Sequence, residues 1–171
     1  LDGLLAEARG AGAPVVGGDT VAGPVVMVSV TALGDLAGRA PVLRSGASVG
    51  AEVAVCGRLG HAAAGLAVLS RGFRSPRALV DAHRRPVPPY AAGPAAAIAG
   101  ATAMCDVSDG LLADLGHIAE ASGVGIVLEA ARLPVDEPLL AAAAAIGVDP
   151  LQWVIAGGED HALAAAFPAG T

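Results

Sequence analysis

The chain has 171 residues, of which 54% are hydrophobic, 15% are charged and only 2% are aromatic. That apolar fraction excludes an intrinsically disordered chain, and the length suits one domain, or one domain and part of another. The formal net charge is −6, and all ten basic residues are Arg. An acidic chain without a basic patch has no electrostatic attraction for a polyanionic backbone, so we expect no nucleic-acid partner.

Two apolar stretches raise the question of a membrane span, and neither has the sequence of a spanning helix. Residues 86–105 carry no charge but include prolines at positions 86, 88, 89 and 94, which would break a helix repeatedly. Residues 139–155 contain Asp149 and Pro150 in their middle. We therefore expect no membrane partner.

Cys56 and Cys105 are the two cysteines, and each lies in an apolar run typical of a strand. Two cysteines are too few for a disulfide framework. We expect reduced, buried thiols and a cytoplasmic protein.

The first part of the chain predicts one helix and two strands. Residues 1–9 form a helix whose apolar residues share one face, and Gly10 and Gly12 end it. A short strand follows over residues 13–16, and a Val-rich run over residues 25–33 predicts a longer one.

Helices and strands are mixed in the rest of the chain. Ser75 is the expected N-cap of its helix, followed by Pro76 at the first position. Because the elements follow no strict alternation, the predicted fold class is α/β, of the α+β kind with a mixed sheet. The predicted strands are 52–56, 102–105, 124–128 and 162–167, and the predicted helices are 60–71, 75–84, 90–99, 108–122, 138–146 and 151–155.

A polar stretch of small residues begins at Arg44, just before the predicted strand 52–56, and we place a domain boundary there. The first domain then covers residues 1–43 and the second covers residues 44–171. Both ends of the chain read as if they were cut within a domain, so we expect a fragment of a longer protein.

Three acidic clusters lie beside strand ends, each among small residues. Taken singly, an ordinary turn explains the first and the third. Taken together, the three clusters contain several carboxylates without Lys or Arg side chains to balance their charge. A divalent metal ion is the usual partner of such a group. The clusters are Gly17-Gly18-Asp19-Thr20, Asp106-Val107-Ser108-Asp109-Gly110 and Gly157-Gly158-Glu159-Asp160-His161.

The second cluster lies where an apolar strand runs into the clearest helix of the chain. Asp106 falls at the end of the strand, Ser108 near the helix N-cap and Asp109 in the first turn. A helix N-terminus favours a phosphate, and two carboxylates three residues apart could hold Mg²⁺. The alternative is a capping device, in which Ser108 or Asp109 caps the helix and stabilises it by about 1 kcal/mol.

Other polar residues carry weaker signals. Arg44 is the candidate cation for a phosphate, because a guanidinium binds phosphate oxygens in pairs, and a solvated surface Arg is the alternative. His117 follows Asp109 by two helical turns, and we expect it to be structural. We expect Asp114 to face solvent or to form a pair on the helix surface.

Taken in order along the chain, these motifs resemble the thiamine-monophosphate kinase family, within the ATP-binding superfamily of proteins like aminoimidazole-ribonucleotide synthetase. The resemblance implies the two-domain architecture of that superfamily. Residues 1–43 would then be the remnant of the N-terminal ATP-binding domain, and residues 44–171 a C-terminal α/β domain truncated at its end. The matching motifs are Gly17-Gly18-Asp19-Thr20, Arg44-Ser45-Gly46-Ala47, Asp106-Val107-Ser108-Asp109-Gly110-Leu111, Asp114-Leu115-Gly116-His117 and Gly158-Glu159-Asp160.

The same resemblance implies an enzyme that uses ATP and Mg²⁺ to phosphorylate thiamine phosphate to thiamine diphosphate. It implies no catalytic base, because the attacking phosphate oxygen is already anionic. Substrate contact is implied for Glu159. The implied Mg²⁺ ligands are Asp19, Asp106 and Asp109, and the implied ATP contacts are Gly18, Asp19, Arg44 and Ser108.

A homodimer formed through the N-terminal domain is implied as well, so we expect this chain to be inactive on its own. Two alternatives stay open. One is another enzyme of the superfamily, such as a purine-precursor synthetase, a selenophosphate synthetase or a hydrogenase-maturation protein. The other is a truncated module that binds nucleotide or dimerises without catalysis.

Overall fold

The structure, a computed structural model, describes residues 1–171 and divides into two compact units, Leu1–Ala40 and Pro41–Thr171. In the first unit, α1 (Asp2–Gly10) confirms the predicted helix. The strands predicted over residues 13–16 and 25–33 are wrong, because both stretches are irregular and exposed. A strand needs a hydrogen-bonded neighbour, and no other segment of this unit pairs with either stretch, whatever its β-propensity.

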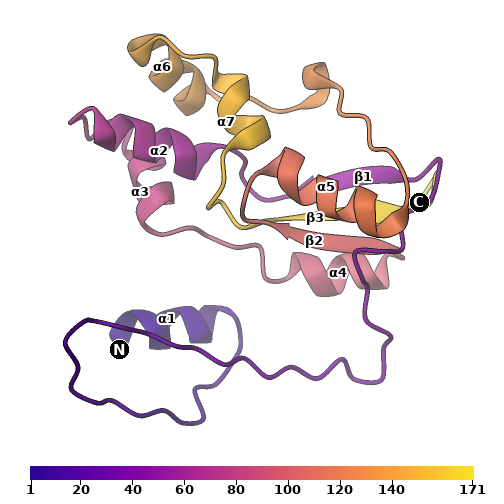
Figure 1. Ribbon diagram of the computed structural model, residues 1–171, viewed down its shortest axis with the longest axis horizontal. Helices are drawn as coiled ribbons and strands as arrows, with labels where there is room; N and C mark the ends of the chain where they lie inside the picture. The colour runs from indigo at the N-terminus through magenta and orange to yellow at the C-terminus, as the bar shows by residue number, and fades with distance from the viewer. The chain divides into compact units, whose positions relative to one another are not determined.

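The second unit is built on a three-stranded antiparallel sheet with the order β1-β3-β2 (Figure 1). The strands are β1 (Glu52–Cys56), β2 (Ala103–Val107) and β3 (Ala162–Phe167). The predictions for β1 and β3 are confirmed, and β2 extends two residues beyond its predicted end. The strand predicted over residues 124–128 is wrong, since this stretch forms an extended connection with no ladder partner.

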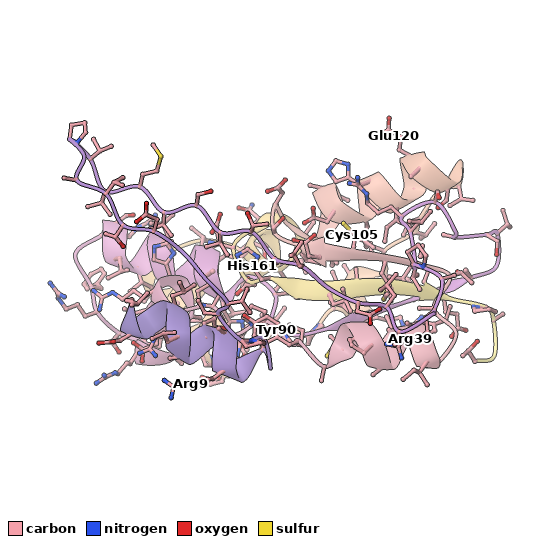
Figure 2. All side chains as sticks on the ribbon, turned by 90° about the horizontal axis from the view of Figure 1, so that it is seen from below. Arg9, Arg39, Tyr90, Cys105, Glu120 and His161 are labelled. Atoms are coloured by element: carbon pink, nitrogen blue, oxygen red, sulfur yellow. The ribbon has the colours of Figure 1, made fainter.

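Helices cover both faces of the sheet, with α5 (Leu111–Ser122) on one face and α4 (Ala92–Ile98) on the other (Figures 1 and 2). The inner side of α5 is apolar and fully buried, whereas Glu120 projects away from the sheet (Figure 2). The core therefore fills the space between α5 and the sheet, and it continues among the helices at the end of the sheet. Its main contributors from these elements are Ala103, Val107, Leu111, Leu115, Ile118, Ala162, Ala164 and Ala166.

Four further helices gather at one end of the sheet (Figure 1). They are α2 (His61–Ser70), α3 (Arg77–Arg84), α6 (Glu137–Ile146) and α7 (Pro150–Ala156), and a short 3-10 helix, η1 (Ala130–Arg132), precedes α6. The N-cap of α3 is Pro76, so the prediction of Ser75 as cap is wrong by one residue. Proline fits there because its ring fixes φ near the observed −66° and the position needs no N–H donor.

The α+β fold class is confirmed. The predicted mixed sheet is not what the structure shows, because all three strands pair antiparallel. No single helix is long and apolar enough to cross a membrane. Only α6 and α7 taken together reach that length and composition, and they are bent by 119° with respect to each other.

Both cysteines are free, as predicted, but neither is buried. Cys56 is exposed because β1 is an edge strand, and Cys105 on β2 is half-buried. The prediction of two buried thiols is therefore wrong.

The packing of α5 can be tested with two leucines of the same helix. Leu115→Ala removes a side chain that is 2% exposed, and we expect the free energy of unfolding to fall by about 2–5 kcal/mol. Leu112→Ala is the matched control, because Leu112 is 59% exposed and its loss should change stability by less than about 0.5 kcal/mol. Urea unfolding measures both, and equal losses would contradict this packing.

Candidate functional site

The loops that carry the second and third acidic clusters meet at one end of the sheet. Val107, the last residue of β2, pairs with Ala162, the first residue of β3. Since the two strands are antiparallel, the segment that leaves β2 and the segment that enters β3 lie at the same end of the sheet. The pairing therefore brings together Ser108–Asp109 and Gly158–Glu159, which are fifty positions apart in the sequence.

The turn from β2 into α5 is held by Asp114. Its Oδ2 accepts hydrogen bonds from the backbone N–H groups of Asp109 (3.0 Å) and Gly110 (3.1 Å), and the residue is 3% exposed. Gly110, without any side-chain oxygen, is the N-cap. The alternative of capping by Ser108 or Asp109 is therefore not what the structure shows, and the solvent-facing or surface-paired position expected for Asp114 is wrong. The carboxylate of Asp109 is left exposed instead.

Asp106 lies on the face of the sheet opposite to α5. Its neighbours Cys105 and Val107 alternate with it along β2, and Val107 is in the core. A hollow of about 330 Å³ beside this edge strand is lined by Arg44, Met104, Cys105, Asp106 and Leu163. Burial and the nearby Asp106 carboxylate raise the pKa of the Cys105 thiol. The structure thus brings together Asp106 and Arg44, two of the residues singled out in the sequence.

The segment that carries Arg44 is fastened at both ends of a short turn. Ser122 Oγ, at the end of α5, donates to the backbone carbonyl of Arg44 (2.9 Å) and accepts from the N–H of Ala47 (3.1 Å). Gly46 is required between them, because a Cβ there would overlap the carbonyl oxygen of Thr102. The Arg44 backbone is therefore fixed against the start of β2.

The third cluster is hydrogen-bonded directly to the second. The N–H of Glu159 donates to the carbonyl of Ser108 (2.7 Å), and a Cβ on Gly158 would lie 2.5 Å from the same oxygen. Only glycine allows this approach, which explains the small residue before Glu159. A second hollow, of about 280 Å³, opens beside this contact. It is lined by Ala62, Ala63, Leu66, His83, Ser108, Asp109, Gly158 and Glu159.

Sequence reasoning missed the structural role of Asp160. This residue is 6% exposed, and its Oδ1 accepts a hydrogen bond from the N–H of Ala62 (2.9 Å) at the start of α2, while its Oδ2 is buried without a partner. Burial raises the pKa of the Asp160 carboxyl group. The only signal in the sequence is a carboxylate two residues before the apolar strand β3, and the sequence interpretation assigns the chemistry of this motif to Glu159 alone.

Gly18 and Asp19 belong to the first unit, where both are exposed. The carboxylate of Asp19 accepts a hydrogen bond from the N–H of Thr20 (2.8 Å). Their assignment to the ATP and metal site remains a prediction.

One residue of the second cluster, Asp109, belongs to a group of side chains that could hold a metal ion. Asp109, Asp114 and His117 bring one ligand atom each within 4.8 Å of one another. Asp114 already accepts two backbone hydrogen bonds, so within this group the exposed Asp109 offers the more available oxygens. Asp106 is not in this group and lines the other hollow, so the structure does not bring it together with Asp109. Carboxylate oxygens are the ligands that Mg²⁺ prefers. His117 is exposed, so the structural role expected for it is not one of packing in the core.

Known proteins resemble this chain in sequence. Residues 48–161 match the family described as AIR synthase related protein, C-terminal domain. The thiamine-monophosphate kinase of Mycobacterium tuberculosis is 58% identical over 168 residues, which are 98% of this chain and 50% of that protein. The thiamine-monophosphate kinase of Corynebacterium glutamicum is 43% identical over 88% of this chain and 47% of that protein. The chain spans about half the length of the curated relatives it matches.

Solved structures share the fold. Thiamine monophosphate kinase from Aquifex aeolicus matches with a TM-score of 0.70 and 34% identity, over 76% of this chain and 46% of that chain. A structure described as AaThiL complexed with AMPPCP and TMP matches with a TM-score of 0.68 and 35% identity, over 73% of this chain and 41% of that chain. These likenesses confirm the architecture that the motifs predicted.

The capping role of Asp114 can be tested by its removal. Asp114→Ala leaves the N–H groups of Asp109 and Gly110 without their carboxylate acceptor, and we expect a loss of about 1.5–3 kcal/mol in stability. Amide hydrogen exchange at Asp109 and Gly110 should become faster in the variant. Glu120→Ala, on the exposed side of α5, is the control and should change neither quantity. Unchanged exchange in Asp114→Ala would contradict the cap.

The buried carboxyl of Asp160 predicts a pH dependence of stability. Its pKa is raised in the folded state, so above about pH 4 the native protein holds a proton that the unfolded chain has lost. The contribution of Asp160 to stability therefore falls as the pH rises through the folded-state pKa. Asp160→Asn keeps an oxygen acceptor and has no proton to lose, so its stability should increase relative to the parent over that range. Thermal unfolding of the parent and of the variant at several pH values measures this. A difference in melting temperature between them that is the same at every pH would contradict the prediction.

Proposed function

The chain belongs to the AIR synthase related family through the C-terminal domain of that family, and on this premise we propose that its full natural chain is a thiamine-phosphate kinase. The enzyme transfers the terminal phosphoryl group of ATP to thiamine phosphate, giving thiamine diphosphate and ADP. The observation that carries the proposal is the hydrogen bond from Glu159 to Ser108, because it joins the proposed substrate residue to the proposed ATP and metal residues. The names of the relatives and the AMPPCP and TMP of one solved structure support the choice of substrates.

The main obstacle in this reaction is electrostatic, since donor and acceptor are both phosphates and repel each other. Asp106 and Asp109, together with Asp19 of the first unit, would hold Mg²⁺. When bound, the ion supplies positive charge that screens the phosphates and stabilises charge that develops during transfer. Arg44 binds phosphate oxygens with its guanidinium, on the same side of the sheet as Asp106.

The remaining residues position the two substrates. Ser108 and the backbone of Gly18 contact ATP, and Glu159 contacts thiamine phosphate. No side chain is needed as a general base, because the attacking oxygen of thiamine phosphate is already anionic. The chain's contribution to the rate is therefore orientation and charge neutralisation.

The assembly and location of the enzyme are part of the same proposal. We propose a homodimer that forms through the N-terminal domain of the full natural chain. We also propose that the enzyme is located in the cytoplasm, and the two free thiols support this location.

Two isosteric substitutions test the proposed metal ligands. Asp106→Asn and Asp109→Asn keep the size of two exposed side chains, so the fold should survive. We expect kcat for thiamine diphosphate formation to fall by roughly 100-fold or more, because an amide is a weaker ligand and carries no charge. Chromatography of thiamine diphosphate formed by the full natural chain with ATP and Mg²⁺ measures this.

Removal of the metal and a matched variant complete that experiment. EDTA in excess over Mg²⁺ should abolish the product, and Glu120→Gln, whose side chain projects away from the sheet, should retain full activity (Figure 2). Full activity in both aspartate variants would refute the metal assignment. Absence of any product from the parent enzyme would refute the proposed function itself.

A further inference from the structure

The hollow beside Glu159 has two walls of opposite character. One wall is apolar and comes from a single helix: Ala62, Ala63 and Leu66 all lie on α2. The lining on the side of the β2–α5 and α7–β3 connections carries Asp109 and Glu159, both of them exposed. In Figure 1, α2 and the segment that joins α7 to β3 are found at the same end of the sheet.

Two features give the apolar wall its shape. Leu66 is 50% exposed, although Val68 of the same helix is 2% exposed and lies in the core. Gly65 lets α3 approach closely, because a Cβ there would collide with the carbonyl oxygen of Leu79 and lie 2.8 Å from the Cβ of His83. The close approach places His83 at the edge of the hollow, so that α2 and α3 form one continuous wall.

The lining indicates the chemistry of a ligand. Small and aliphatic side chains offer a surface on which a flat ring can be buried by the hydrophobic effect. Because Asp109 is assigned to Mg²⁺, Glu159 is the carboxylate that remains for a ligand in this hollow. No Arg is among the lining residues, so the hollow favours a positively charged ligand over a neutral or anionic one. An aromatic cation with a polar, hydrogen-bonding ring matches both walls.

Thiamine phosphate has this combination, since it carries a cationic thiazolium ring linked to an aminopyrimidine. We infer that Leu66 and His83 determine specificity for these rings, and that they hold them against the wall opposite Glu159. This inference rests on the proposed function and extends it from one substrate residue to a ring-binding wall. The side chains of Ala62 and Ala63 are small, so they leave space for the rings beside α2.

Steady-state kinetics of the full natural chain test the inference. In Leu66→Ser, we expect the KM for thiamine phosphate to rise about tenfold, because the ring loses its apolar contact. In His83→Ala, the same constant should rise several-fold. The KM for ATP should stay within about twofold of the parent value in both variants, because the proposed ATP contact that shares this hollow, Ser108, is left unchanged and Arg44 lines the other hollow.

A matched leucine serves as the control. Leu140 on α6 is 46% exposed, close to the value for Leu66, and it does not line the hollow. Leu140→Ser should leave both KM values unchanged. If Leu66→Ser and His83→Ala bind thiamine phosphate as well as an active parent does, the ring-binding wall is refuted while the kinase function stands. If the parent does not phosphorylate thiamine phosphate, the proposed function itself fails.

Discussion

The antiparallel pairing of Val107 with Ala162 is the constraint on which the candidate site depends. A shift of this register by one residue would turn Asp106 into the core and Val107 out of it, because successive side chains of a strand point to opposite faces. The hydrogen bond between Glu159 and Ser108 joins the two segments just beyond the end of the paired strands. Two loops that are distant in the sequence thereby form a single surface.

Carboxylates in this protein serve two different purposes, and burial separates them. Asp114 and Asp160 are almost fully buried, and each accepts backbone hydrogen bonds at the beginning of a helix. Asp106, Asp109 and Glu159 are exposed and free to meet ligands. The buried pair fixes the backbone on either side of the exposed residues, so the geometry of the site does not depend on the ligands that it binds.

The sequence predicted those elements whose signal is local. The amphipathic pattern of α5 and the apolar run of β3 suffice to place both. The second and third acidic motifs fall in two loops that the structure brings into contact. The run over residues 25–33 has the composition of a strand but no partner to pair with, which no local pattern reveals. Asp114 and Asp160 were misjudged or missed for a related reason, because their burial is decided by tertiary packing.

The backbone conformation of Glu159 has a consequence for how this loop can change. Its φ of +70° lies in the left-handed region, which costs a non-glycine residue about 1–2 kcal/mol. Glycine would be the more stable residue at this position, yet it has no carboxylate. The loop therefore sacrifices some stability to retain a functional group. Selection for thermostability alone would tend to remove the residue that we assign to the substrate.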